Sequence, residues 1–156
     1  FGINFIKKTK TYYEGEFNNG KKEGSGILLI DNGKYEGEFK DDKICGIGSF
    51  YFKDERVYHG EWLDNKMEGI GILKWKDGKK YEGYFKDNKK EGFGVFYSDN
   101  KIYYGDWKNS RLEGNVFINE KGTFNRFEYK NGKKVKKFVI KNMTKLNELI
   151  KNINND

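Results

Sequence analysis

Histidine and cysteine, which most often bind metals or act as nucleophiles, are almost absent from this chain of 156 residues. His59 and Cys45 are the sole members of their types. A structural zinc site needs about four such ligands, and a nucleophilic cysteine needs an adjacent base. One histidine without a cluster of cysteines or carboxylates gives no metal signal, and Cys45 has no evident base. We therefore expect no metal site, no catalytic residue and no cofactor.

Two further patterns resemble catalytic motifs. Glu14 with Glu16, and Glu36 with Glu38, are carboxylate pairs of the kind that general acid–base chemistry uses. Because such pairs return at a regular interval, they indicate a solvated surface. The Gly-x-Gly pair that begins at Gly24 suggests a phosphate loop, but such a loop lies between a strand and a helix. These glycines lie within predicted strands, so we expect a protein that is not an enzyme.

The remaining chemistry is aromatic, and the rings recur with a period of 22 or 23 residues. Five copies of Tyr-x-Gly-x-Phe/Trp begin at Tyr13, Tyr35, Tyr58, Tyr81 and Tyr103. A fixed period of this length is typical of a repeat array. We do not expect one sheet to bury all these rings, and contiguous aromatic surface usually marks a binding site. The residues predicted to line a partner groove are Tyr35, Phe39, Tyr58, Trp62, Trp75, Tyr81, Phe85, Tyr103 and Trp107.

Each copy is predicted to fold as a β-hairpin, and the copy at residues 58–78 shows the pattern most clearly. Strand alternation places Tyr58, Gly60 and Trp62 on one face. The chain then turns around Asn65, a residue type that tolerates the positive φ of a tight hairpin turn. The return strand is expected to place both glycines of its Gly-x-Gly pair on the same face as the rings.

The strand glycines are predicted to have a packing role. Glycine weakens a strand unless another group approaches the backbone closely. We expect the rings of one hairpin to lie over the bare backbone of the next. The glycines assigned to this structural role are Gly15, Gly37, Gly60, Gly83 and Gly105.

The sequence Tyr-x-Gly-x-Trp/Phe, followed by Gly-x-Gly and a turn, closely resembles the MORN repeat (membrane occupation and recognition nexus) over about residues 13–124. The fifth copy departs from the pattern, because Val116 stands where its second glycine belongs. The resemblance implies an all-β fold, an elongated and twisted single antiparallel sheet of consecutive hairpins with an aromatic-lined groove. It implies no reaction.

The array is predicted to occupy residues 1–138. It comprises a partial copy over 1–12, repeats starting near 13, 35, 58, 81 and 103, and a degenerate capping copy over 125–138. A basic tail follows at 139–156, where Met143, Leu146 and Ile150 recur at helical spacing. We expect an amphipathic α-helix at about 143–153 that packs on the end of the array, since solenoid ends are usually capped. Self-association through that helix is the alternative.

Most of the net charge of +7 lies in residues 130–156, which contain eight lysines and two acidic residues. A lysine near an anionic membrane contributes about 1 kcal/mol. The candidate contacts to acidic phospholipid are Lys133, Lys134, Lys136 and Lys137. Nucleic acid is not an expected partner, because these lysines are not interleaved with stacking rings. A single cysteine and the lack of an apolar span or signal-peptide pattern favour a cytoplasmic location, peripheral at a membrane or the cytoskeleton.

The leading hypothesis is therefore a protein–protein interaction or scaffold module that binds a peptide or helix of a protein partner along its groove. The family resemblance suggests a membrane–cytoskeleton or ciliary setting. Two alternatives stay open. The chain could be a membrane tether that binds acidic phospholipid, or the regulatory array of a larger enzyme.

Overall fold

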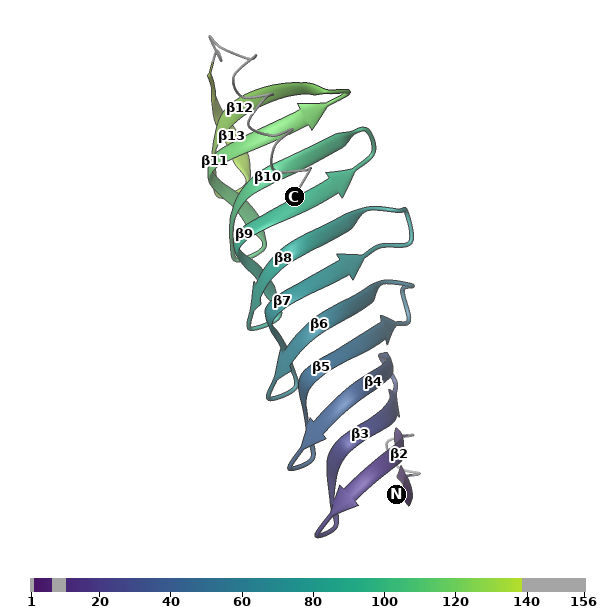
Figure 1. Ribbon diagram of the computed structural model, residues 1–156. Coiled ribbons are helices and arrows are strands. Elements are labelled where there is room, and N and C mark those ends of the chain that lie inside the picture. The colour runs from purple at the N-terminus through teal and green to yellow at the C-terminus, as the bar shows by residue number, and fades with distance from the viewer. Residues whose placement is uncertain (1, 7–10, 139–156) are drawn as a thin grey trace, which may run out of the picture.

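The computed structural model describes residues 2–6 and 11–138, and over these residues the chain forms a single open antiparallel sheet with no helix (Figure 1). Thirteen strands lie in chain order, each hydrogen-bonded to the next, so the sheet is an unbroken run of hairpins. The strands are β1 (Gly2–Ile6), β2 (Thr11–Asn18), β3 (Lys21–Ile30), β4 (Gly33–Lys40), β5 (Lys43–Phe52), β6 (Val57–Leu63), β7 (Lys66–Lys74), β8 (Lys80–Lys86), β9 (Lys89–Ser98), β10 (Lys101–Lys108), β11 (Arg111–Glu120), β12 (Thr123–Lys130) and β13 (Lys133–Phe138). The all-β architecture predicted from the sequence is confirmed.

Within each repeat, a two-residue turn closes the hairpin, as the sequence predicts. Asp64 and Asn65 join β6 to β7, and their φ angles are 48° and 65°. Positive φ at both central residues defines the type I′ turn, whose twist matches that of the strands. The turns also interlock: the Asn65 side chain accepts the backbone N–H of Ile44, 2.9 Å away in the preceding repeat. Equivalent side-chain bonds join Asp42 to Lys22, Asn88 to Met67 and Ser110 to Lys90.

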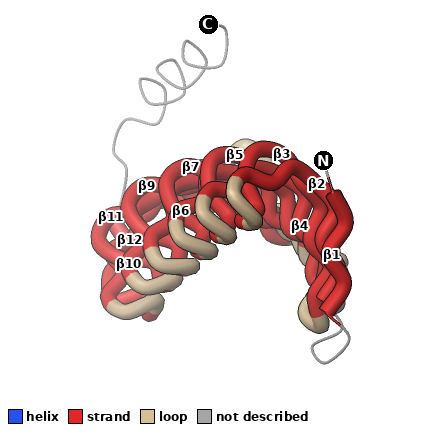
Figure 2. Tube along the Cα trace, turned by 90° about the horizontal axis from the view of Figure 1, so that it is seen from below, coloured by secondary structure: helices blue, strands red, loops and turns tan. Residues whose placement is uncertain are grey.

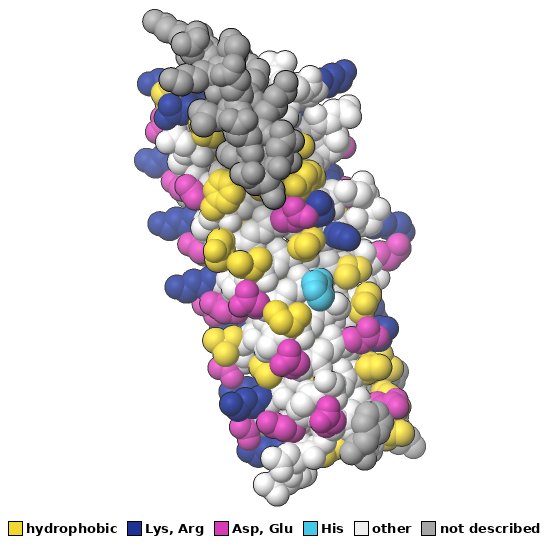
Figure 3. Space-filling view, in the orientation of Figure 1, with side chains coloured by type: hydrophobic (Ala, Val, Ile, Leu, Met, Phe, Trp, Pro, Cys, Tyr) yellow, Lys and Arg dark blue, Asp and Glu magenta, His cyan; other side chains and the backbone are white. Residues whose placement is uncertain are grey.

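The two faces of the sheet differ as strand alternation predicts. Along β6, Tyr58, Gly60 and Trp62 are buried while His59 and Glu61 are exposed. We call the face with the buried rings the ring face and the opposite face the outer face. The sheet curls into an arch with the ring face on its inner side (Figure 2), and Figure 3 shows the outer face.

In the first four repeats, the leading tyrosine lies over the glycines of its own hairpin. A Cβ atom on Gly71 would lie 2.5 Å from Cε2 of Tyr58, and one on Gly60 would lie 2.5 Å from Cα of Gly71. The Tyr58 hydroxyl donates to the backbone carbonyl of Glu61 at 2.9 Å. The prediction that strand glycines accept a ring is therefore confirmed, but the ring comes from the same repeat. The prediction that it comes from the neighbouring hairpin was wrong.

Contacts between repeats are made instead by ring against ring. Tyr58 meets Phe85 of the next repeat edge to face. The same contact joins Tyr13 to Phe39, Tyr35 to Trp62, Tyr58 to Phe85 and Tyr81 to Trp107, with ring centroids 5.0–5.4 Å apart. Edge-to-face pairs at such distances add about 0.5–1.5 kcal/mol to the burial of the rings. The ladder of rings thus replaces the central core that a one-layer sheet lacks.

The first glycine of each Gly-x-Gly pair does not lie on the ring face, which corrects the prediction. The register passes from Gly60–Gly71 to Trp62–Met67, so the intervening residues of β7 lie opposite Glu61 alone. Gly69 has a φ of +65°, and a Cβ there would lie 2.5 Å from the Glu61 carboxylate. That carboxylate accepts the N–H of Ile70 at 2.9 Å. Gly69 is therefore a bulge residue that faces the glutamate.

The ring-over-glycine arrangement ends in the fifth repeat. Val116 occupies the second glycine position, and a Cβ on Gly105 would lie 2.9 Å from Val116 Cγ2. Tyr103 is consequently only half-buried, and a separate cluster of Val116, Ile118 and Phe127 forms the core there. The degenerate copy at 125–138 completes the sheet. It comprises residues 125–130 of β12 and the whole of β13. The helix predicted at about 143–153 lies outside the described residues.

Candidate interaction site

Seven of the nine residues predicted to line the groove are buried. Tyr35, Phe39, Tyr58, Trp62, Tyr81, Phe85 and Trp107 are each 7% exposed or less. Burial accordingly raises the pKa of the Tyr58 hydroxyl above its usual value. The premise that one sheet cannot bury these rings is therefore wrong, because the curled sheet packs each ring between two others. Among the nine, only Trp75 and Tyr103 are half-buried, and a partner-binding role of the set stays a prediction.

The five glycines predicted to be structural divide into two groups. Gly15, Gly37, Gly60 and Gly83 each pack against the backbone of a facing glycine and the hydroxyl of their own tyrosine. Gly105 instead faces Val116, so it has no ring to accommodate. The four glycines of the first group hold the ring ladder together, and they contribute no surface to a site.

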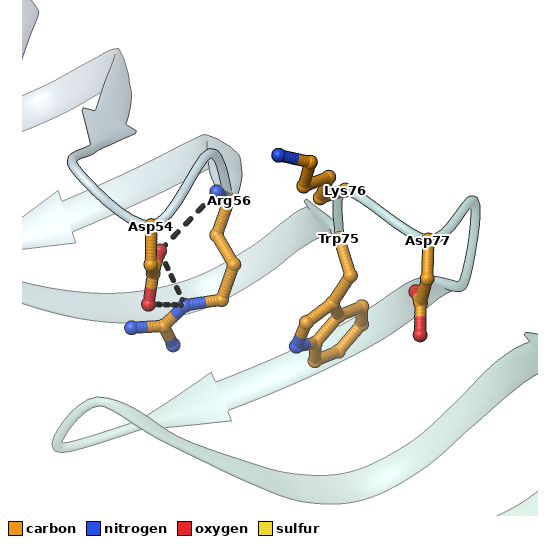
Figure 4. Close-up of a pocket in the computed structure, with 5 residues that line it drawn as sticks. All are labelled: Asp54, Arg56, Trp75, Lys76 and Asp77. Atoms are coloured by element: carbon orange, nitrogen blue, oxygen red, sulfur yellow. Dashed lines mark hydrogen bonds and ion pairs between the residues drawn. The ribbon is translucent and has the colours of Figure 1, made fainter.

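Trp75 is the most accessible tryptophan, and it projects from the end of β7 into a hollow of about 650 Å³. Asp54 and Arg56 form one side of this hollow, and Lys76 and Asp77 form the other. Figure 4 shows the indole standing between the Arg56 guanidinium and the Asp77 carboxylate, with Lys76 directed away. Arg56 is held in place by Asp54, whose Oδ2 lies 2.8 Å from Nε.

The accessible part of the ring face extends from Trp75 in both directions. Arg56 lies 4.5 Å above the ring of Phe52 on one side. On the other side the Phe96 ring is 5.9 Å from both Trp75 and Tyr103. All four of these rings are half-buried. We call Phe52, Arg56, Trp75, Phe96 and Tyr103 together the Trp75 surface. The sequence prediction missed Phe52 and Phe96, although alternation along β5 and β9 places both of them on the ring face.

A lysine within the ring ladder adjoins this surface. The Lys90 ammonium lies 4.0 Å from the ring centroid of Trp107 and 5.4 Å from that of Trp75. Burial among these rings lowers the pKa of Lys90 to about 8, because desolvation disfavours the charged form. This lysine was not predicted as a functional residue, since the sequence shows only that it alternates with Glu91.

The outer face carries exposed apolar residues among its acidic ones (Figure 3). Ile47, Ile70 and Phe93 hold the same position in successive repeats and are 48%, 55% and 54% exposed. Tyr84 lies beside Ile70 in the register and is 51% exposed. The mixed outer face predicted from the sequence is confirmed. Because it also exposes apolar residues, it is the alternative binding surface to the ring face.

His59 and Cys45 have ordinary structural surroundings. His59 shares a hydrogen bond of 2.8 Å with the Ser49 hydroxyl on the outer face. Burial raises the pKa of the Cys45 thiol, which lowers its reactive thiolate fraction. Among the described residues, no three His, Cys, Asp or Glu side chains are grouped to hold a metal ion, and no helix is long and apolar enough to cross a membrane.

The four lysines predicted to contact lipid all lie on β13 and are exposed. Lys134 and Lys137 lie 3.8 and 5.8 Å from the ring centroid of Phe127, a residue buried in the ring-face core. Lys136 instead lies 4.9 Å from the ring centroid of Phe138. The lysines are therefore divided between the two faces of the last strand.

A single-layer array of interlocked hairpins, with one accessible surface on its inner face, defines an open β-repeat protein. The family model of the MORN repeat matches residues 13–34, 35–55, 58–80 and 81–101, which together make up more than half of the chain. The chain belongs to the MORN repeat family. Repeats of this family are generally modules that interact with proteins or membranes. No curated protein matches the chain.

Proposed function

We propose that this array is a non-enzymatic interaction module that binds a peptide or helix of a protein partner at the Trp75 surface. The observation that supports the proposal most directly is the row of half-buried rings beside the hollow at Trp75. Partly exposed aromatic residues next to a pocket are the commonest anchors of protein–protein interfaces. The setting suggested by the family is a membrane–cytoskeleton or ciliary structure.

The rest of the ring face supports this choice of surface. In the first four repeats the leading tyrosine of each motif is at most 1% exposed, so these four rings offer a partner almost no area. The departure of Val116 from the repeat pattern leaves Tyr103 half-buried, and Phe96 beside it is half-buried as well. Arg56 adds a guanidinium at the rim, where a partner carboxylate or aromatic ring could pair with it. A partner would thus find apolar area and polar contacts together along repeats two to five.

Contact with acidic phospholipid is the second proposal, and the arrangement of β13 supports it less well. Its lysines are exposed, which favours attraction to an anionic surface. A flat membrane, however, would meet only the lysines on one face of the strand at a time. The apparent attraction should therefore be smaller than four coplanar lysines would give.

Replacing Trp75 by alanine is expected to abolish partner capture by the full chain, because it removes the largest accessible ring of the surface. The matched control is Ile70→Ala, which truncates an apolar residue that is 55% exposed on the outer face. Both variants should remain folded, since neither residue is part of the buried ring ladder. The measurement is a pull-down with the two variants and the parent, followed by mass spectrometry.

A set of proteins that binds the parent and Ile70→Ala, but not Trp75→Ala, would identify partners of the Trp75 surface. Loss of the same proteins in Ile70→Ala alone would place binding on the outer face and would contradict the proposal.

A further inference from the structure

Lys90 occupies a position that apolar residues fill in most repeats. Cross-strand from the Phe or Trp of each repeat, the successive copies carry Lys22, Ile44, Met67, Lys90 and Leu112. Among the five full repeats, the first and fourth place a charge at this position of the ring ladder, and the degenerate copy places the exposed Lys134 there. The rings attract such a cation, but its charge is neutralised only by an anionic partner, which lies either within the protein or in a bound molecule.

Lys22 has such a partner, and Lys90 does not. The Lys22 ammonium lies 3.5 Å from the carboxylate of Asp42, the second turn residue of the next repeat. The corresponding turn residue for Lys90 is Ser110, whose hydroxyl accepts the backbone N–H of Lys90 at 3.1 Å. In the part of the chain that the structure describes, no acidic group forms an ion pair with the Lys90 ammonium, and desolvation is the sole cause of its lowered pKa.

The surroundings of the Lys90 ammonium are aromatic on several sides. Its Nζ lies 5.4 Å from the ring of Trp75, 5.2 Å from Tyr81, 5.1 Å from Phe96 and 4.0 Å from Trp107. Trp75 and Phe96 belong to the Trp75 surface, and Lys90 itself is partly exposed. Lys90 therefore lies directly beside the surface on which a partner would bind.

A second donor beside Lys90 also lacks a partner. Nε1 of Trp107 is buried and makes no hydrogen bond in the described structure. In the third repeat the equivalent Trp62 donates from Nε1 to the carbonyl of Gly48 at 3.2 Å. A buried donor without an acceptor usually costs about 1–3 kcal/mol. The fourth repeat thus presents an ammonium without an anionic partner, and the fifth presents an indole N–H without an acceptor. The equivalent groups in earlier repeats, Lys22 and Trp62, both have partners.

We propose that Lys90 and Trp107 form the recognition site for a carboxylate, supplied by an acidic side chain of the peptide that binds the Trp75 surface. This inference rests on the proposed function and specifies the chemistry of its partner. A carboxylate would pair with the Lys90 ammonium and accept a hydrogen bond from the Trp107 indole, and its aliphatic stem would lie against the accessible edges of the Trp75 and Phe96 rings. It would play the part that Asp42 plays for Lys22.

A carboxylate fits these groups better than a phosphate does. The site offers an ammonium and an indole N–H, and the remaining walls are the apolar rings of Trp75, Tyr81 and Phe96. A monoanion can be satisfied by one ammonium and one further donor. A phosphate carries up to two charges and more oxygens, and it is usually bound by several Arg, Lys or backbone N–H donors.

The chain itself supplies the variants for a test. Ser110→Asp introduces the carboxylate found at Asp42, and aspartate tolerates the positive φ of this turn position, as Asp42 does at 67°. Ser110→Asn introduces the neutral residue found at Asn65 and Asn88 in the same position. The aspartate variant should neutralise Lys90 from within, whereas the asparagine variant should leave the site unchanged.

The probe is hydrocinnamate, a phenyl ring joined by two methylenes to a carboxylate, and its control is the neutral amide, hydrocinnamide. With three tryptophans, the full chain gives three indole N–H signals that can be followed by NMR. Hydrocinnamate is expected to shift the Trp107 signal saturably and to raise the measured pKa of Lys90. Hydrocinnamide should do neither. Ser110→Asp should weaken hydrocinnamate binding by about tenfold or more, whereas Ser110→Asn should change it by less than about threefold.

Equal responses to acid and amide, an unchanged affinity in Ser110→Asp, or no response to either probe would overturn the inference. Tighter binding of phenyl phosphate than of hydrocinnamate would overturn the carboxylate assignment in favour of a phosphorylated ligand. Failure of the proposed function can be told apart from failure of this inference, because the proposed function is tested by whether Trp75→Ala loses partner capture. If Trp75→Ala loses the partner while Lys90→Met retains it, the module function stands and the carboxylate site does not.

Discussion

Gly60→Val is expected to lower the free energy of unfolding by about 3 kcal/mol or more, the upper end of the range for overpacked cores. The ordinary β propensity of valine predicts the opposite sign. The added Cβ would lie 2.5 Å from Gly71 Cα and 2.6 Å from the Ile70 carbonyl oxygen. Because both atoms belong to the backbone, no change of side-chain rotamer can relieve the contact.

The matched control for Gly60→Val is Gly78→Asn. A Cβ at Gly78 would have no atom within 4 Å, and asparagine tolerates its φ of +85°. We expect a change of less than about 1 kcal/mol for this variant. Urea denaturation followed by tryptophan fluorescence measures both. A midpoint of Gly60→Val equal to the parent's would show that the tyrosine and the paired glycines are not in contact.

Lys90→Met should stabilise the array at neutral pH by roughly 2–3 kcal/mol, since a pKa unit corresponds to about 1.4 kcal/mol. Burial lowers the pKa of Lys90 in the folded state from 10.5 to about 8. Between these two values the unfolded chain binds more protons, so the stability of the parent should rise as the pH increases from about 8 to 10.5. Below pH 8 the full cost of the buried charge is present. Methionine avoids that cost, and the same position already holds Met67 in the third repeat.

The advantage of Lys90→Met should therefore shrink as the pH rises through this window. Lys89→Met is the control, because Lys89 is exposed at the start of β9 and its replacement should change stability by less than about 0.5 kcal/mol at any pH. The measurement is the urea midpoint of the parent and both variants at several pH values from 7 to 10.5. A destabilised Lys90→Met, or a gain that does not depend on pH, would mean that the folded protein already pairs Lys90 with an acid.

Much of the fold was predictable from local rules. The period of the tyrosines defines the hairpins, and residues such as Asn65 identify the turns because few residue types accept positive φ. The bulge at Gly69 was not predictable by the same means. Strict alternation assigns Gly69 to the ring face, and it fails where three residues of β7 lie opposite one residue of β6. A glycine with positive φ is the signal that marks such a position.

The candidate site was predicted only in part. Trp75 and Tyr103 were among the expected groove residues, but the sequence does not show which rings the curl of the sheet buries. Burial depends on edge-to-face contacts between repeats about 22 residues apart, such as that of Tyr58 with Phe85. Lys90 was missed because its surroundings combine rings from β8, β9, β10 and the residue that follows β7. No single repeat contains that information.

The measurement that most directly tests where this module binds is site-specific photo-crosslinking of the full chain. p-Benzoylphenylalanine would replace Trp75 in one protein and Ile70, on the outer face, in another. The predicted result is a crosslink to the captured partner from position 75 and none from position 70. A crosslink from position 70 with none from position 75 would show that the outer face is the binding surface and would contradict this account.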